Sequence, residues 1–148
     1  MTIDDIIDQV AALDGVLVLH PQPGDGSPQI SWGDVFFFYY APTGEVTRTQ
    51  PFASIVTKDY PDEPVSGLDR PGAFRLNIGV PASASTPQST ARETNPSTPD
   101  AWFPHPVYGR AGWISVVDPA ERTAEEAMRL LETAHAAARR RYQRRLSD

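Results

Sequence analysis

Two segments of the chain, one near each end, repeat apolar residues at the three- and four-residue spacing of a helix. The stripe near the amino end consists of Ile3, Ile6, Ile7, Val10 and Leu13. Thr2 is a suitable cap, and Asp4 and Asp5 fall in the first turn, where the helix dipole favours negative charge. Asp14-Gly15 is expected to end the helix, because glycine readily takes the left-handed conformation found there. These positions predict an amphipathic first helix.

A longer helix is predicted to close the chain. Its expected buried stripe is Ala124, Ala127, Met128, Leu131, Ala134, His135, Ala138 and Tyr142. Two caps compete: Asp118 is followed by Pro119, which suits a first helical position, whereas Thr123 with Glu126 fits a capping box. Either start gives a helix with glutamates early and arginines late, as the helix dipole favours.

Between the helices, five segments rich in β-branched and aromatic residues are predicted as strands. They cover residues 16–20, 30–41, 52–57, 74–80 and 113–117. Gly33 predicts a bulge or tight bend in the second segment. A hairpin turn at residues 42–45 (PTGE) makes the second and third strands antiparallel. In the fourth segment apolar residues alternate with Arg75, Asn77 and Gly79, which predicts a strand buried on one face only.

The short links between these segments favour antiparallel neighbours. We therefore predict an α+β fold in a single domain, residues 1–148, with an antiparallel five-stranded sheet and the N-terminal and long C-terminal helices packed on one face. Residues 81–99 (PASASTPQSTARETNPSTP) contain no large apolar side chain and many serines, threonines and prolines. That composition predicts a disordered or mobile loop.

The composition of the chain indicates the cellular compartment of the protein. The chain contains no cysteine, which excludes disulfides and thiolate metal sites and fits a reducing compartment. Its acidic, amphipathic start does not resemble a signal peptide, and no apolar run approaches the ~20 residues needed to span a bilayer. We expect a cytoplasmic protein that does not interact with a membrane.

Charge is distributed unevenly along the chain. The net charge is −6, but the last ten residues hold five arginines and one aspartate, so the remainder carries −10. An acidic body disfavours nucleic-acid binding, which needs a basic face. Residues 139–145 (RRRYQRR) keep that function as an alternative, beside the simpler interpretation of a solvated helix end that suits the dipole.

The most chemically varied loop, residues 100–112 (DAWFPHPVYGRAG), precedes the last strand. His105 lies between two prolines, which restrict the backbone, and histidine titrates near neutral pH. Tyr108, Arg110 and Trp102 add polar groups and an aromatic wall. The loop is a candidate pocket wall, and the simpler alternative is that its rings plug one end of the sheet.

Residues from two earlier loops complete the candidate pocket. Lys58 is suited to an anionic ligand, and Asp59 to orienting a histidine or a cation. Alternatively Asp59 caps a turn and pairs with Lys58 in solvent, and Arg70 braces its loop through carboxylates or carbonyls. The full candidate pocket is His105, Tyr108, Arg110, Lys58, Asp59, Arg70 and Trp102.

The sequence supports a catalytic or metal site less well than a binding site. His20, His105 and His135 lack the close spacing of a metal motif, and we predict no metal or other cofactor. The chain has neither a cysteine nucleophile nor a Gly-x-Ser-x-Gly elbow. A non-enzymatic module for an unknown small molecule or protein is the leading hypothesis. A hydrolase-like enzyme using His105 as acid or base, with Asp59 or Tyr108, is the first alternative.

Four longer strings resemble a known family. PFASIVTKDYP, LDRPGAFRLNIGV, WFPHPVYGRAGWISVVDP and LLETAHAAARRRY resemble an uncharacterised actinobacterial family, domain of unknown function 6194. The layout is similar to that of MmcQ/YjbR-like proteins, in which a tryptophan-bearing strand leads into a final helix. The resemblance implies a compact α+β fold and brings no established enzyme activity or catalytic residues that could be carried over. At residues 81–99 the family implies a short helix with an aromatic anchor, and this chain has neither. Either the segment is disordered in this chain, or its reading frame is altered.

Overall fold

A computed structural model describes residues 1–39, 50–61, 66–81 and 95–147, with the side chains of residues 145–147 excepted. The predicted turn at residues 42–45 lies outside the described residues, as do residues 82–94 of the predicted mobile loop. In chain order the elements are α1 (Ile3–Ala11), β1 (Val16–Leu19), η1 (Gln29–Ser31), β2 (Val35–Tyr39), β3 (Ala53–Val56), β4 (Arg75–Gly79), β5 (Trp102–Pro104), η3 (Gly109–Ala111), β6 (Trp113–Val117) and α3 (Ala124–Ser147).

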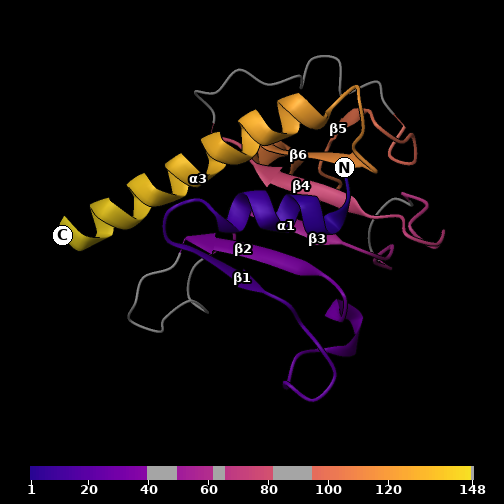
Figure 1. Cartoon of the computed structure of the whole chain (residues 1–148), viewed down its shortest axis with the longest axis horizontal. Helices are drawn as coiled ribbons and strands as arrows, with labels where there is room; N and C mark the ends of the chain where they lie inside the picture. Colours follow the sequence, from indigo (N-terminus) through magenta and orange to yellow (C-terminus); the bar gives the residue numbers. More distant parts are fainter. Residues whose placement is uncertain (40–49, 62–65, 82–94, 148) are drawn as a thin grey trace.

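The strands form one sheet in the order β1-β2-β3-β4-β6-β5, and every neighbouring pair is antiparallel (Figure 1). The prediction of five strands is therefore wrong by one edge strand. Trp102 to Pro104 of β5 pair with Val116 to Ile114 of β6, in a segment predicted as a loop. An edge strand tolerates proline, because half of its backbone groups need no partner in the sheet.

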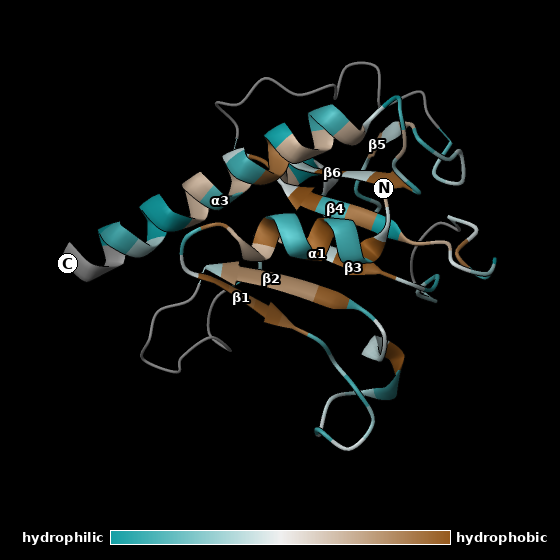
Figure 2. Ribbon diagram, in the orientation of Figure 1, coloured by the Kyte–Doolittle hydropathy of each residue, from teal (hydrophilic) through white to brown (hydrophobic). Residues whose placement is uncertain are grey.

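α1 and α3, which correspond to the two predicted helices, lie on the same face of the sheet, as predicted (Figure 1). Ile6 and Val10 of α1 and Leu130 and Leu131 of α3 are fully buried in one apolar core with Leu76 of β4. The outer sides of both helices are polar (Figure 2). We call the covered side of the sheet the helix face. None of the helices in the described ranges has the length and apolarity to cross a bilayer.

The two helices begin in different ways. The Thr2 hydroxyl accepts from the Asp5 N–H and the Asp5 carboxylate accepts from the Thr2 N–H, which confirms Thr2 as the cap of α1. The turn that leads into α3 is held by a distant residue: the Asp100 carboxylate accepts from the Thr123 hydroxyl at 2.6 Å and from three backbone N–H groups before the helix. Burial opposes the charged form of Asp100, but these hydrogen bonds outweigh it and lower the pKa of Asp100.

Two further predictions need correction. The capping box of Thr123 with Glu126 is replaced by the Asp100 contact, and Glu126 pairs with Arg129. The strand predicted over residues 30–41 starts only at Val35, because residues 29–31 form η1 and Gly33 takes a positive φ of 89°. Glycine adopts that conformation without the steric cost other residues meet, so the chain bends there.

Candidate functional site

The seven residues predicted to form one pocket are divided between opposite ends of the sheet. Lys58 and Asp59 follow β3, at the end where β4 begins, and Arg70 precedes β4 at the same end. His105 follows β5 and lies beside the start of β6, where β4 ends. β4 has five residues, so the two ends are about 13 Å apart along the strand.

At the first end, a buried carboxylate that is not among the predicted site residues organises the loop after β3. Asp34 is fully buried. It accepts from the Thr57 N–H at 2.9 Å, the Lys58 ammonium at 2.9 Å and the Tyr60 hydroxyl at 2.5 Å. Lys58 also donates to the Trp32 carbonyl at 2.9 Å. Lys58 is therefore engaged with Asp34, so the expected pairing with the neighbouring aspartate does not form.

The other two polar residues at this end hold their own loop in place. Asp59 accepts from the backbone N–H groups of Ser66, at 2.8 Å, and Leu68, at 3.2 Å. Arg70 donates to a carbonyl of its loop at 2.8 Å and lies 3.5 Å from the Asp118 carboxylate. These contacts agree with the simpler alternative for both residues: a capping aspartate and a bracing arginine.

At the second end, His105 is buried among aromatic rings. Its ring centroid lies 5.0 Å from that of Tyr108 and 6.1 Å from that of Trp113. Nδ1 accepts from the N–H groups of Val107 and Tyr108, at 3.0 and 3.1 Å, which places the proton of the neutral ring on Nε2. Burial, with a smaller effect of the Arg75 charge, lowers the pKa of His105 to about 4. The ring is therefore neutral at physiological pH.

The two remaining predicted residues lie apart from this ring cluster. Arg110 is exposed on η3, the short turn that leads into β6. Trp102 pairs with Val116 and packs against the apolar core of the helix face. Trp102 was expected to supply an aromatic wall of the pocket. Because successive side chains of a strand alternate between the two faces, Trp102 lies on the opposite face of the sheet from Phe103, which pairs with Ser115.

The side of the sheet away from the helices, which we call the loop face, carries a buried polar network across three strands. The Asn77 carbonyl oxygen accepts from Ser115 at 2.7 Å and from Arg75 Nε at 2.9 Å, and its amide donates to Ser54 at 3.2 Å. Arg75 also donates to Ser66 at 3.3 Å. Because Arg75 and Asn77 are each 1% exposed, the prediction that β4 is buried on one face only is wrong. Polar groups can be buried where hydrogen bonds replace those to water.

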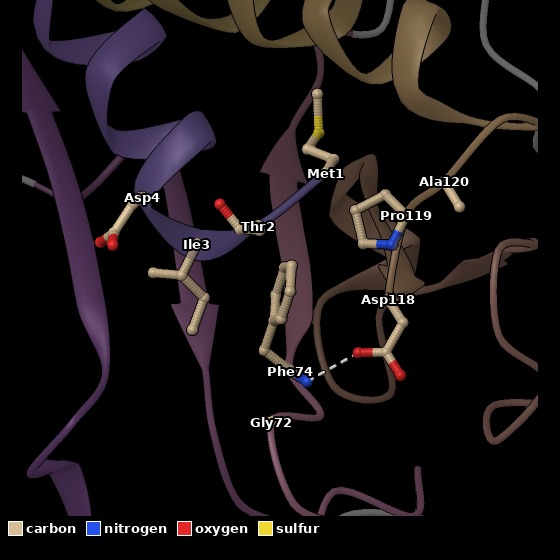
Figure 3. Close-up of a pocket in the computed structure, with 9 residues that line it drawn as sticks. All are labelled: Met1, Thr2, Ile3, Asp4, Gly72, Phe74, Asp118, Pro119 and Ala120. Carbon is tan, nitrogen blue, oxygen red and sulfur yellow. Dashed lines mark hydrogen bonds between the residues drawn. The ribbon is translucent and has the colours of Figure 1, made fainter.

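A pocket of about 630 Å³ opens beside the start of α1, within the range of small-ligand sites. It is lined by Met1, Thr2, Ile3, Asp4, Gly72, Phe74, Asp118, Pro119 and Ala120. Figure 3 shows Met1, Phe74, Asp118 and Pro119 grouped around it, whereas Asp4 points away from the other four. None of the seven predicted residues lines this pocket, although Arg70 contacts Asp118 from outside.

The Asp118 carboxylate is held firmly in the wall of this pocket. Its oxygen accepts from the Phe74 N–H at 3.0 Å, and the Asp118 N–H donates to the Phe74 carbonyl at 3.0 Å (Figure 3). The backbone of Asp118 has a positive φ of 46°, which aspartate tolerates better than most residues. The sequence predicts Asp118 only as a helix cap, and no local pattern indicates its contact with Phe74.

These observations define an α+β protein with two helices on one sheet face, a polar network on the other and a ligand-sized pocket beside a helix start. Within the described ranges, no group of three histidine, aspartate or glutamate side chains is placed to hold a metal ion. The chain belongs to a family of unknown function (DUF6194), whose model matches residues 1–147. No curated protein and no solved structure matches the chain.

Proposed function

We propose that this protein is a non-enzymatic binding domain, and that the pocket beside α1 takes a small ligand with an apolar body and a hydrogen-bond-donating head. The observation that carries the proposal is the meeting of apolar walls from Met1, Phe74 and Pro119 with the fixed carboxylate of Asp118. Apolar walls with few oriented polar groups are typical of small-molecule sites. The carboxylate accepts hydrogen bonds, so the ligand head must donate them.

A positively charged head fits this pocket better than a neutral one. Asp4 and Asp118 contribute two negative charges to the lining of the pocket, and Arg70 sets one positive charge against them from outside. Arg70 and Asp118 are partly exposed and 3.5 Å apart, so this ion pair leaves the carboxylate available to a ligand. Outside its last ten residues the chain carries −10, which raises the local concentration of cations. An amine with an apolar chain is therefore the ligand class we expect.

The contacts of the acid–base candidates favour binding over the hydrolase-like alternative. His105 has Nδ1 engaged by two backbone N–H groups and a pKa lowered to about 4, far from the value suited to proton transfer at neutral pH. Asp59, its proposed partner, lies at the other end of the sheet, where its carboxylate holds two backbone N–H groups.

The test compares three probes that share a hexyl chain and differ in the head: hexylamine, hexanol and heptanoate. We expect the amide NMR signals of residues 2–4, 72–74, 118 and 120 to shift, with affinity falling from amine to alcohol to carboxylate. Asp118→Asn keeps an oxygen for the Phe74 N–H and tolerates the positive φ, but removes the charge. It should weaken the amine about tenfold, a change of about 1.4 kcal/mol, and leave the alcohol unchanged.

Asp8→Asn is the matched control, because Asp8 is exposed on α1 outside the pocket. If Asp8→Asn weakens the amine as much as Asp118→Asn does, the attraction is a general effect of charge and the site is wrong. Ala120 is exposed in the pocket wall, so Ala120→Leu should fill the space and weaken all three probes. Shifts confined to the His105 ring cluster would place the ligand elsewhere.

Cytoplasmic location, actinobacterial origin and the likeness in layout to MmcQ/YjbR-like proteins stay predictions. Nucleic-acid binding through the arginines at the end of α3 stays the second alternative, and the acidic body of the protein disfavours it.

A further inference from the structure

The last part of α3 extends beyond the rest of the described protein. The buried positions of α3 end at Ala138, and Figure 1 shows the helix continuing past the sheet to the carboxyl end. Arg140 and Arg144 are exposed there and lie one helical turn apart, so they share a side of the helix. We call residues 139–144 the basic arm. Figure 2 shows that this part of α3 is strongly hydrophilic.

The outer side of α1 carries the opposite charge at the same spacing. Asp4 and Asp8 are exposed and also lie one turn apart. Residues 1–14 contain four aspartates and no lysine or arginine. Asp4 points away from the pocket residues Phe74 and Asp118, which leaves its carboxylate open to a partner (Figure 3).

We infer that the basic arm docks on α1 of a second copy of this chain, with Arg140 and Arg144 facing the pair Asp4 and Asp8. The matching spacing allows both arginines to meet a carboxylate at once. A two-fold axis would repeat the contact, since each copy offers both an arm and an α1. The dimer would then contain four arginine–carboxylate contacts.

One chain cannot make these contacts with itself. Asp4 lies beside Ala120 in the pocket wall, before the first turn of α3. Arg140 lies 16 residues after the start of α3 at Ala124, about 24 Å further along the helix axis. Within the chain, the arm is instead anchored on its other side, where Arg139 lies 3.9 Å from Asp14 and the tilted rings of Tyr142 and Tyr39 have their centroids 5.4 Å apart.

Charge also favours a second copy over nucleic acid. The arm is about 9 Å long, since it has six residues. Phosphates held by the arm would therefore lie within about one Debye length of a body that carries −10, which repels them. A second copy, with a net charge of −6, is repelled as well, but it is far less densely charged than a nucleic acid, which carries one negative charge per ~1.7 Å of duplex. Because all of these side chains are exposed, the association is weak and sensitive to salt.

Sedimentation equilibrium tests the proposal with variants in which the charges of the arm or of α1 are reversed. At an ionic strength of about 0.02 M the average mass should rise with concentration from 16.2 kDa towards twice that value, and at about 0.5 M it should stay at 16.2 kDa. The variants R140E/R144E and D4K/D8K should each remain single chains at low salt. Their equimolar mixture should recover the dimer, because the reversed arm of one now faces the reversed α1 of the other.

R140E/R144E leaves Arg139 in place at Asp14, and circular dichroism checks that each variant keeps its helices. If D4K/D8K loses helix, D8K/Q9K replaces it: both residues are exposed in the last turn of α1, where positive charge is favoured. A wild-type chain of 16.2 kDa at every concentration at low salt overturns the proposal. So does a dimer that persists in either single variant, or DNA binding lost in R140E/R144E but kept in D4K/D8K.

Discussion

The two faces of the sheet are buried by different means, and β4 shows both. Leu76 points to the helix face, where apolar side chains pack against α1 and α3. Asn77, the next residue, points to the loop face and is buried by hydrogen bonds to Ser54, Arg75 and Ser115. An apolar core loses contact area when a side chain is shortened, whereas a polar network loses partners. The two faces should therefore respond differently to substitution.

The largest expected effect is on the helix face. Leu76→Ala should lower the free energy of unfolding by about 2–5 kcal/mol, because Leu76 is fully buried and its removal leaves a cavity between the sheet and the helices. Urea denaturation followed by circular dichroism measures the change. The loss should be the same at pH 5 and pH 8, since no titrating group fills the gap. A loss under 1 kcal/mol would mean that the helices settle onto the sheet and that this face is not tightly packed.

His105 should make the stability of the loop-face side of the protein depend on pH. In the unfolded chain the His105 pKa is near 6.5, and in the folded protein it is about 4. As the pH falls from 6.5 to 4, the unfolded state binds a proton that the folded state does not, so stability decreases. At 1.36 kcal/mol per pKa unit the total is about 3 kcal/mol, and above pH 6.5 this group has no effect.

His105→Asn is the variant that isolates this effect. The asparagine carbonyl oxygen can accept from the N–H groups of Val107 and Tyr108 as Nδ1 does, but it does not titrate. The difference in unfolding free energy between the variant and the wild type should change between pH 6.5 and pH 4 and be constant above pH 7. A difference that is constant throughout would mean that His105 titrates alike in both states.

Asn77→Ala should cost about 1–3 kcal/mol, because it leaves Arg75, Ser54 and Ser115 short of a partner inside the protein. A double-mutant cycle with Ser115→Ala separates this from simple loss of volume. The two substitutions should cost less together than the sum of their separate effects, since the second removes a hydroxyl that the first had left unpaired. Strict additivity would show that the network does not act as a unit.

Much of the helix face could be predicted from the sequence. The spacing of Ile6, Val10 and Leu131 specifies helices with one apolar side, and the alternation around Leu76 specifies a strand that faces them. β5 escaped detection because it has three residues and contains Pro104, and proline is normally read as a loop former. Local pattern predicts an element well only when the element is long enough to show its period.

The loop face and the pocket could not be predicted in the same way. In an alternating pattern, the polar residues are predicted to be exposed. Arg75 and Asn77 are buried instead, because hydrogen-bond partners on other strands replace water in the network. Asp34 likewise meets Lys58, 24 residues later in the chain. The pocket joins three segments that are distant in sequence, around Met1, Phe74 and Asp118. Contacts of this kind follow from the fold, and no motif in a single stretch of residues encodes them.

The smallest effect is expected at Arg70, and it tests where the buried polar network of the loop face ends. Arg70 and Arg75 are five residues apart, but the Arg70 side chain is 48% exposed and Arg75 is 1% exposed. Arg70→Ala should change the free energy of unfolding by less than about 0.5 kcal/mol, because water can replace the arginine at the Asp118 carboxylate and at the loop carbonyl. Urea titrations at low and high salt measure it, and the small difference should shrink as salt screens the pair. A salt-independent loss above about 2 kcal/mol would place Arg70 inside the buried network, and the loop face would then extend to the edge of the pocket.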